Sequence, residues 1–179
     1  MKDNFLPRYF FIDNGGGKSW DLFAGMEITR TIVRKKTPFQ EISILESPVY
    51  GKMLVLDGVL QSTVADEAIY HEFLVHPALV LHSQPENVLI LGGGEGATLR
   101  EVLKNPLVKK AVLVDIDKEV VYLTQRYLPE MWQKCYQDKR AQIKINEATQ
   151  FLKKTSQKFD LILSDLTDPL TDSASIVFS

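Results

Sequence analysis

One run of residues in this chain has the types and spacing that could bind a nucleoside. Gly92-Gly93-Gly94-Glu95-Gly96-Ala97 contains G-x-G-x-x-A between a predicted strand and a predicted helix. Glycines let the backbone approach a ligand closely, and a helix N-terminus offers free N–H groups. Asp115 ends the next predicted strand, where a carboxylate can hold ribose hydroxyls. The run therefore predicts a nucleoside site, with a tight structural turn as the alternative.

The charge of Glu95, inside this loop, narrows the kind of nucleoside that we expect. A carboxylate here would repel a pyrophosphate or an amino-acid carboxylate and would attract an ammonium or a sulfonium group. Glu95 therefore disfavours NAD. It favours an adenosyl sulfonium whose tail carries an amine without a carboxylate.

A second group of carboxylates follows the fourth predicted strand of the same region. Asp165 and Asp168 lie three residues apart in Ser164-Asp165-Leu166-Thr167-Asp168-Pro169. Loops at the carboxyl ends of parallel strands are where such sheets bind ligands. With Glu95, the two acids would suit a polycationic substrate, and one could accept a proton from an amine. The alternative is a solvated turn.

The elements that must position these residues fall into two regions. Residues 21–64 are predicted to form short strands with a hairpin at Asp57-Gly58, and a helix is expected from about residue 66. After Pro85, strands alternate with helices, which implies a parallel sheet. The strands are expected at residues 88–91, 111–114, 142–145 and 159–163, and the helices at residues 98–104, 118–127 and 148–154. We predict an α/β protein with two domains. Residues 1–64 would form a small antiparallel β-domain with a flexible N-terminal segment, and residues 65–179 an incomplete Rossmann-like, methyltransferase-type domain.

Composition excludes several other classes of protein. Among 179 residues, 21 Lys and Arg balance 23 Asp and Glu, so the net charge of −2 gives no signal for nucleic-acid binding. No apolar run approaches the ~20 residues that span a bilayer. A single cysteine, Cys135, excludes an internal disulfide framework and favours a reducing, cytoplasmic setting. His71 and His76 resemble a zinc-protease helix, but their spacing of five residues turns the two rings apart, so no metal is expected.

The motifs together resemble those of the polyamine aminopropyltransferases, the spermidine synthase family. The resemblance runs from about Gln40 to Pro169. It includes residues 50–58, residues 61–63 followed by residues 66–72, and residues 91–101, together with two shorter matches at residues 114–117 and residues 165–169. The resemblance implies a small β-domain followed by a Rossmann-like domain, as homodimers or homotetramers when the protein has its full length.

The resemblance also implies an activity, which is transfer of an aminopropyl group from decarboxylated S-adenosylmethionine to an amine with release of methylthioadenosine. This molecule would be a co-substrate, with no prosthetic group. Asp165 would orient and deprotonate the amine with help from Tyr70, while His71 and Asp168 would line the amine site. The remaining implied contacts are with the donor: Gln40, Glu95, the loop glycines Gly92 and Gly94, Asp115 at the ribose, and Glu147 with Ala148 at the adenine.

Some residues depart from the spermidine-forming pattern. Glu95, Asp115 and the Leu166-Thr167 pair look more like the agmatine or triamine and thermospermine synthase branch, which favours agmatine or spermidine over putrescine as the acceptor. Because the sequence ends at Ser179 after four predicted parallel strands, we expect a truncated chain that has little or no activity alone. The alternatives are an S-adenosylmethionine-dependent methyltransferase and an inactive fragment that only binds nucleoside or polyamine.

Overall fold

The computed structural model describes residues 9–13 and 24–167. The chain divides into two compact units, Met1–Ala65 and Asp66–Ser179, and each is described by itself. The assignment of residues 1–64 and 65–179 to two functional domains stays a prediction. Residues 14–17 of the expected flexible segment lie outside the described residues.

The first unit is built from antiparallel strands. β1 (Tyr9–Asp13) pairs with β2 (Ala24–Ile28). A separate sheet follows in the order β3 (Arg30–Lys36), β4 (Glu41–Ser47), β5 (Gly51–Leu56) and β6 (Val59–Thr63). Asp57 and Gly58 join β5 to β6 with φ values of 49° and 78°, the left-handed conformation that a two-residue hairpin favours. The predicted hairpin and antiparallel sheet are confirmed.

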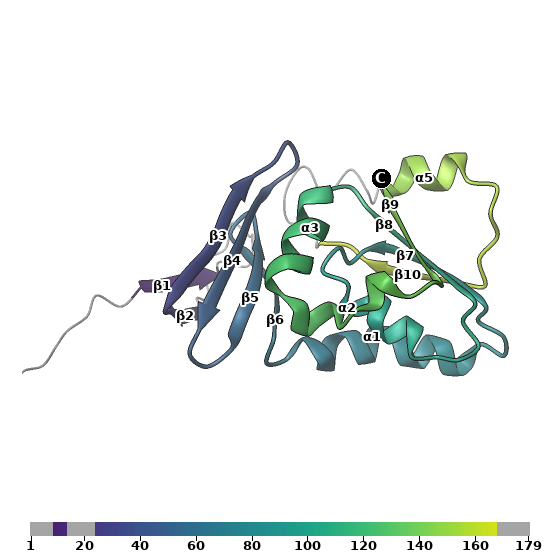
Figure 1. Cartoon of the computed structure of the whole chain (residues 1–179), viewed down its shortest axis with the longest axis horizontal. Helices are drawn as coiled ribbons and strands as arrows, with labels where there is room; N and C mark the ends of the chain where they lie inside the picture. Colours follow the sequence, from purple (N-terminus) through teal and green to yellow (C-terminus); the bar gives the residue numbers. More distant parts are fainter. Residues whose placement is uncertain (1–8, 14–23, 168–179) are drawn as a thin grey trace, which may run out of the picture. The chain divides into compact units, whose positions relative to one another are not determined.

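The second unit contains a four-stranded parallel sheet with helices on both faces (Figure 1). The strand order is β10 (Leu161–Asp165), β7 (Asn87–Gly92), β8 (Lys110–Asp115) and β9 (Ala141–Ile145). The helices are α1 (Glu67–Leu81), α2 (Ala97–Leu103), α3 (Lys118–Tyr127), α4 (Pro129–Trp132) and α5 (Ala148–Lys154), with a 3₁₀ turn, η1, at Cys135–Gln137. The predicted fold class, an antiparallel sheet followed by a Rossmann-like parallel sheet, is confirmed.

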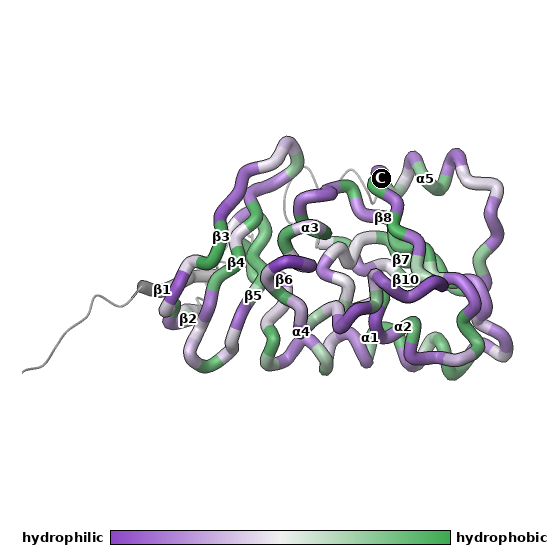
Figure 2. The backbone as a smooth tube through the Cα atoms, in the orientation of Figure 1, coloured by the Kyte–Doolittle hydropathy of each residue, from purple (hydrophilic) through white to green (hydrophobic). Residues whose placement is uncertain are grey.

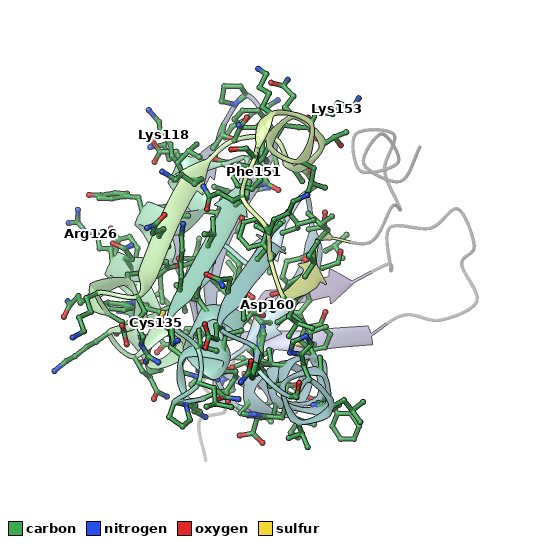
Figure 3. All side chains as sticks on the ribbon, turned by 90° about the vertical axis from the view of Figure 1, so that its right-hand side faces the viewer. Lys118, Arg126, Cys135, Phe151, Lys153 and Asp160 are labelled. Carbon is green, nitrogen blue, oxygen red and sulfur yellow. The ribbon has the colours of Figure 1, made fainter. Side chains whose placement is uncertain are left out.

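The hydrophobic core lies on both faces of this parallel sheet, because the middle residues of β7 and β8, residues 88–91 and 111–114, are apolar and buried (Figure 2). On one face Leu89 and Val112 pack with Phe151 of α5, which Figure 3 labels. On the other face Ile90 and Leu113 belong to a cluster that includes residues of α1 and α2. This double burial is typical of central strands in a parallel sheet and holds their carboxyl ends in a fixed register.

Helix α1 buries only some of the apolar residues that predict it, together with two ionisable side chains. Its buried positions are Glu67, His71, Val75 and Leu79, which are spaced by four residues and share one face. Phe73 is 80% exposed and Val80 is 82% exposed. The helix therefore presents two ionisable side chains to the interior of the unit. Among the described residues, no helix is both long enough and apolar enough to cross a membrane.

The last described strand begins two residues later than its sequence prediction. Residues 159–163 were expected, whereas β10 spans Leu161–Asp165 because Phe159 packs with the cluster of α5 instead of joining the sheet. In the described part of the chain β10 pairs only with β7 and forms one edge of the sheet.

Candidate active site

The site residues of the second unit meet where its parallel strands end. β7 ends at Gly92, β8 ends at Asp115 and β10 ends at Asp165. Asp165 lies opposite Gly92 in the register of β10 and β7. Parallel strands bring their carboxyl ends to one edge, so residues 73 positions apart in the sequence become neighbours.

The glycine loop is shaped by the carboxylates that lie against it. A Cβ atom on Gly93 would stand 2.7 Å from Oδ2 of Asp165, and one on Gly94 would stand 2.5 Å from Oδ2 of Asp115. Gly93 also has a φ of 71°, which L side chains rarely adopt. The hydroxyl of Tyr136 donates a hydrogen bond of 2.6 Å to the carbonyl oxygen of Gly94. Glycine is thus required by the protein's own side chains.

Asp165 is nearly buried and has two hydroxyl donors. The Thr98 hydroxyl donates to Oδ2 at 2.5 Å, and the Tyr70 hydroxyl donates to Oδ1 at 3.3 Å. Burial, together with the charge of Glu95, raises the pKa of Asp165 to about 6. A carboxylate with such a pKa is ionised at pH 7 and is a better proton acceptor than an ordinary aspartate.

Glu95 and Asp165 both approach His71, which is 1% exposed. Nε2 of His71 lies 3.0 Å from Oε1 of Glu95 and 4.0 Å from Oδ2 of Asp165. On the other side of the ring, Nδ1 lies 2.6 Å from the carbonyl oxygen of Glu67 and 3.1 Å from its Oε2. Burial alone would lower the pKa of His71, but hydrogen bonds to Glu67 and Glu95 and the charge of Asp165 raise it to about 10. The ring is therefore an imidazolium among carboxylates.

Asp115 forms the nucleoside end of the predicted site. Burial raises the pKa of Asp115 to about 6, and the nearby charge of Glu95 adds to the effect. The backbone N–H of Asp117 donates to Oδ1 of Asp115 at 2.8 Å, which fixes the orientation of the carboxylate. Above pH 6 this group is an anionic acceptor of the kind that binds paired hydroxyls.

The remaining predicted site residues are not among those that meet at the strand ends. Glu147 is the N-cap of α5, where its carboxylate accepts hydrogen bonds from the backbone of Thr149 at 2.6 Å and Gln150 at 2.8 Å. Gln40 belongs to the first unit, immediately before β4. Asp168 lies outside the described residues. The roles of all three and of Ala148 stay predictions, as do those of the other predicted site residues.

Two groups in the described residues bring histidine and carboxylate atoms within 4.8 Å of one another. One consists of His71, Glu95 and Asp165, and the other consists of Glu72, His76 and Glu101. The two histidines of the zinc-protease-like run thus face different partners. In the second group Lys104 lies 2.7 Å from Glu101, so a cation of the protein already pairs with that carboxylate. We assign no metal to either group.

Sequence reasoning missed four residues that shape the site. Thr98 and Tyr136 hold Asp165 and the glycine loop, while Glu67 and Arg100 form a buried ion pair behind His71. Thr98 carried a signal, because it lies in the first turn after the loop. The others depend on packing between distant segments, which spacing along the chain does not reveal.

Comparisons with known proteins agree with this geometry. A family model described as "Spermine/spermidine synthase domain" matches residues 67–179, and one described as "Spermidine synthase tetramerisation domain" matches residues 23–63. A polyamine aminopropyltransferase of Saccharolobus islandicus is 50% identical over 154 residues, which are 86% of this chain and 51% of that protein. Polyamine aminopropyltransferase 1 of Hyperthermus butylicus is 52% identical over 145 residues, which are 79% of this chain and 50% of that protein. The chain spans about half the length of the curated relatives it matches.

Two solved structures of spermidine synthases are similar to this chain. The crystal structure of spermidine synthase from Thermotoga maritima superimposes with a TM-score of 0.85 at 35% identity, covering 92% of this chain and 55% of that one. A spermidine synthase in complex with the transition state analogue AdoDATO superimposes with a TM-score of 0.89 at 34% identity, covering 97% and 58%.

Proposed function

Because the chain belongs to the spermine/spermidine synthase family, we propose that it transfers the aminopropyl group of decarboxylated S-adenosylmethionine to an amine. One observation carries the proposal: Glu95 and Asp165 converge on His71, with their oxygen and nitrogen atoms within 4.8 Å, at the strand ends that also hold Asp115. Such a cluster of carboxylates suits a doubly cationic donor and an amine acceptor. No prosthetic group is required.

The donor would lie along the glycine loop. Asp115 would accept hydrogen bonds from the ribose hydroxyls, and the loop backbone at Gly92 and Gly94 would approach the nucleoside. Glu95 would face the ammonium of the aminopropyl tail. Glu147 and Ala148 would meet the adenine, and Gln40 would be a further donor-binding residue. The carboxylate of intact S-adenosylmethionine would be repelled by Glu95, which gives the site its preference.

The chemistry would be a single displacement. The amine nitrogen attacks the methylene carbon next to the sulfonium, a C–N bond forms, and the C–S electrons return to sulfur as methylthioadenosine leaves. An alkylamine has a pKa of roughly 10.4, so the acceptor must first lose a proton. Asp165 would take that proton while Tyr70 and Thr98 hold its carboxylate in place. Holding the two reactants in line would supply much of the rate.

The acceptor class we propose is a polyamine or agmatine, bound between Asp165, Asp168 and the neighbourhood of His71. The departures at Glu95 and Asp115 favour agmatine or spermidine over putrescine. The match to a tetramerisation domain supports a homodimer or homotetramer of the full-length protein. The single cysteine favours a cytoplasmic setting.

Two measurements test the proposal. Calorimetry should give at least about tenfold tighter binding of decarboxylated than of intact S-adenosylmethionine, since one like-charge contact costs ~1–2 kcal/mol at a partly buried site. Mass spectrometry should detect methylthioadenosine and an aminopropylated product from a panel of amines. Preference for the intact donor would instead indicate a methyltransferase. Donor binding without product from any form of the protein would indicate a binding module.

A further inference from the structure

The surroundings of His71 determine where its protons lie. Nδ1 lies 2.6 Å from the carbonyl oxygen of Glu67, and a carbonyl oxygen can only accept a hydrogen bond. Nδ1 therefore carries a hydrogen atom. If the ring were neutral, Nε2 would then hold a lone pair and could not donate.

Nε2 nevertheless faces acceptors. It lies 3.0 Å from Oε1 of Glu95 and 4.0 Å from Oδ2 of Asp165, and ionised carboxylates are acceptors only. A proton must lie between Nε2 and Glu95, and the ring is 1% exposed, so water cannot take its place. Although burial alone would lower it, the hydrogen bonds to Glu67 and Glu95 raise the pKa of His71 to about 10, so this proton belongs to Nε2. A ring that donates from both nitrogens has no lone pair left to receive an ammonium group. His71 would thus act on the amine through the two carboxylates.

The carboxylate of Glu67 is held in a fixed orientation behind the ring. Arg100 binds it with both terminal nitrogens, at 2.8 Å to Oε1 and 2.9 Å to Oε2. Arg100 is itself fixed by Glu101 at 2.7 Å and by the carbonyl oxygen of Met131 at 2.5 Å. Glu67 and Arg100 are 7% and 6% exposed, so the bidentate pair is nearly shielded from solvent.

We propose that Glu67, clamped by Arg100, is a positioning residue that keeps His71 an imidazolium facing Glu95 and Asp165. The groups that face the ring are Glu67 of α1, Glu95 of the glycine loop, Asp165 at the end of β10 and the edge-on ring of Tyr70. Three carboxylates therefore stabilise one positive charge. The effect of this charge on catalysis rests on the proposed function, whereas the charge itself does not.

The sign of the effect on the reaction follows from this arrangement. A positive His71 lowers the pKa of Asp165 and so keeps the proposed base ionised. Without the charge of Glu67, His71 would lose its proton more readily, and Asp165 would hold its proton to higher pH. In the pH profiles of activity and of donor binding, the acid limb would then move to higher pH. The alkaline limb would be less affected.

The test is NMR of the histidine side chains, which needs no substrate. The chain has three histidines, so His76 and His82 serve as internal references. In the unmodified protein, we expect both ring nitrogens of His71 to remain protonated above pH 8. In Glu67→Gln, we expect the proton affinity of His71 to fall at least about tenfold, which is one pKa unit. The matched control is Glu72→Gln, on the same helix but 53% exposed, which should leave His71 unchanged.

Three results would overturn the proposal. One is a His71 that titrates near 6.5 in the unmodified protein, which decides the matter even if Glu67→Gln does not fold. Another is an Nδ1 atom of His71 that carries no hydrogen. The third is an unchanged His71 titration in folded Glu67→Gln. Failure to bind decarboxylated S-adenosylmethionine would contradict the proposed function and leave the assignment of Glu67 standing, because the two measurements are independent.

Discussion

Two histidines on helix α1 stand five residues apart, and each meets a carboxylate at hydrogen-bond distance. His71 lies 3.0 Å from Glu95 and is 1% exposed, whereas His76 lies 2.9 Å from Glu101 and is 41% exposed. Glu101 already pairs with Lys104 and Arg100, both at 2.7 Å. The proton on His71, in contrast, has carboxylates on both sides and little water. The same contact distance therefore has different consequences for the proton of the ring, because the two rings differ in their exposure to solvent.

The strongest test of the cluster around His71 is a substitution of Asp165. Asp165→Asn removes the proposed base, so we expect turnover to fall at least ~10²-fold. Methylthioadenosine affinity should change little, because Asp165 is not assigned to the nucleoside. The rate of methylthioadenosine release, measured in the longest available form of the protein, checks this. Asp160→Asn is the matched control, since Asp160 binds Asn87 beside the opposite end of β10. Near-normal turnover of Asp165→Asn would remove Asp165 from its role.

A substitution at the nucleoside end of the site should instead weaken the binding of methylthioadenosine. Asp115→Ala removes two carboxylate acceptors at ~1.5–3 kcal/mol each, so methylthioadenosine should bind at least about tenfold more weakly. Calorimetry measures this directly. Asp115→Asn keeps the shape without the charge, and an intermediate loss would separate the two contributions. Unchanged affinity in both variants would refute the ribose assignment.

The two histidines can be compared through the pH dependence of stability. The pKa of His71 is raised to about 10, so its charge stabilises the fold fully below pH 6.5, and this contribution is lost as the pH rises through 10. His71→Gln should remove a slope approaching about 1.4 kcal/mol per pH unit from the free energy of unfolding in that window. His76→Gln should retain the slope. Urea unfolding between pH 6.5 and 10 tests both, and parallel slopes in the two variants would contradict the difference.

The smallest effect is expected at the exposed end of the second cluster. Glu72 is 53% exposed and lies 4.0 Å from Lys104. Glu72→Gln should change the free energy of unfolding by less than about 0.5 kcal/mol, because solvent screens such pairs. Urea denaturation checks this value. A larger loss would mean that the cluster around His76 resembles that around His71 more than its exposure indicates.

Much of this architecture was predictable from local signals. The helix at residues 148–154 has the predicted bounds, and the alternation of strands and helices after residue 85 gave the parallel sheet. Parallel strands then imply that Gly92, Asp115 and Asp165 share one edge. The convergence of the loop with these carboxylates therefore followed from topology, although their roles toward donor and amine remain predictions.

What was not predictable depends on which face of a helix is buried. The apolar residues of α1 predicted a helix, yet Phe73 is exposed while Glu67 and His71 are buried. Local hydrophobicity could not indicate this, because burial of Glu67 is made possible by Arg100, which lies 33 residues later. The short α4 and η1 segments were missed for a related reason, since each is a single turn without an apolar period.

The contact between the loop glycines and the carboxylates also limits how this protein can change. Gly93 and Gly94 have room for no side chain because Asp165 and Asp115 occupy the space. An alanine at Gly94 would have to be accompanied by a shorter residue at position 115, and an alanine at Gly93 would in addition be strained by the φ of 71°. Substitutions at these paired positions should therefore be strongly non-additive, so that redesigning donor specificity means altering the backbone turn and its acidic neighbours in one step.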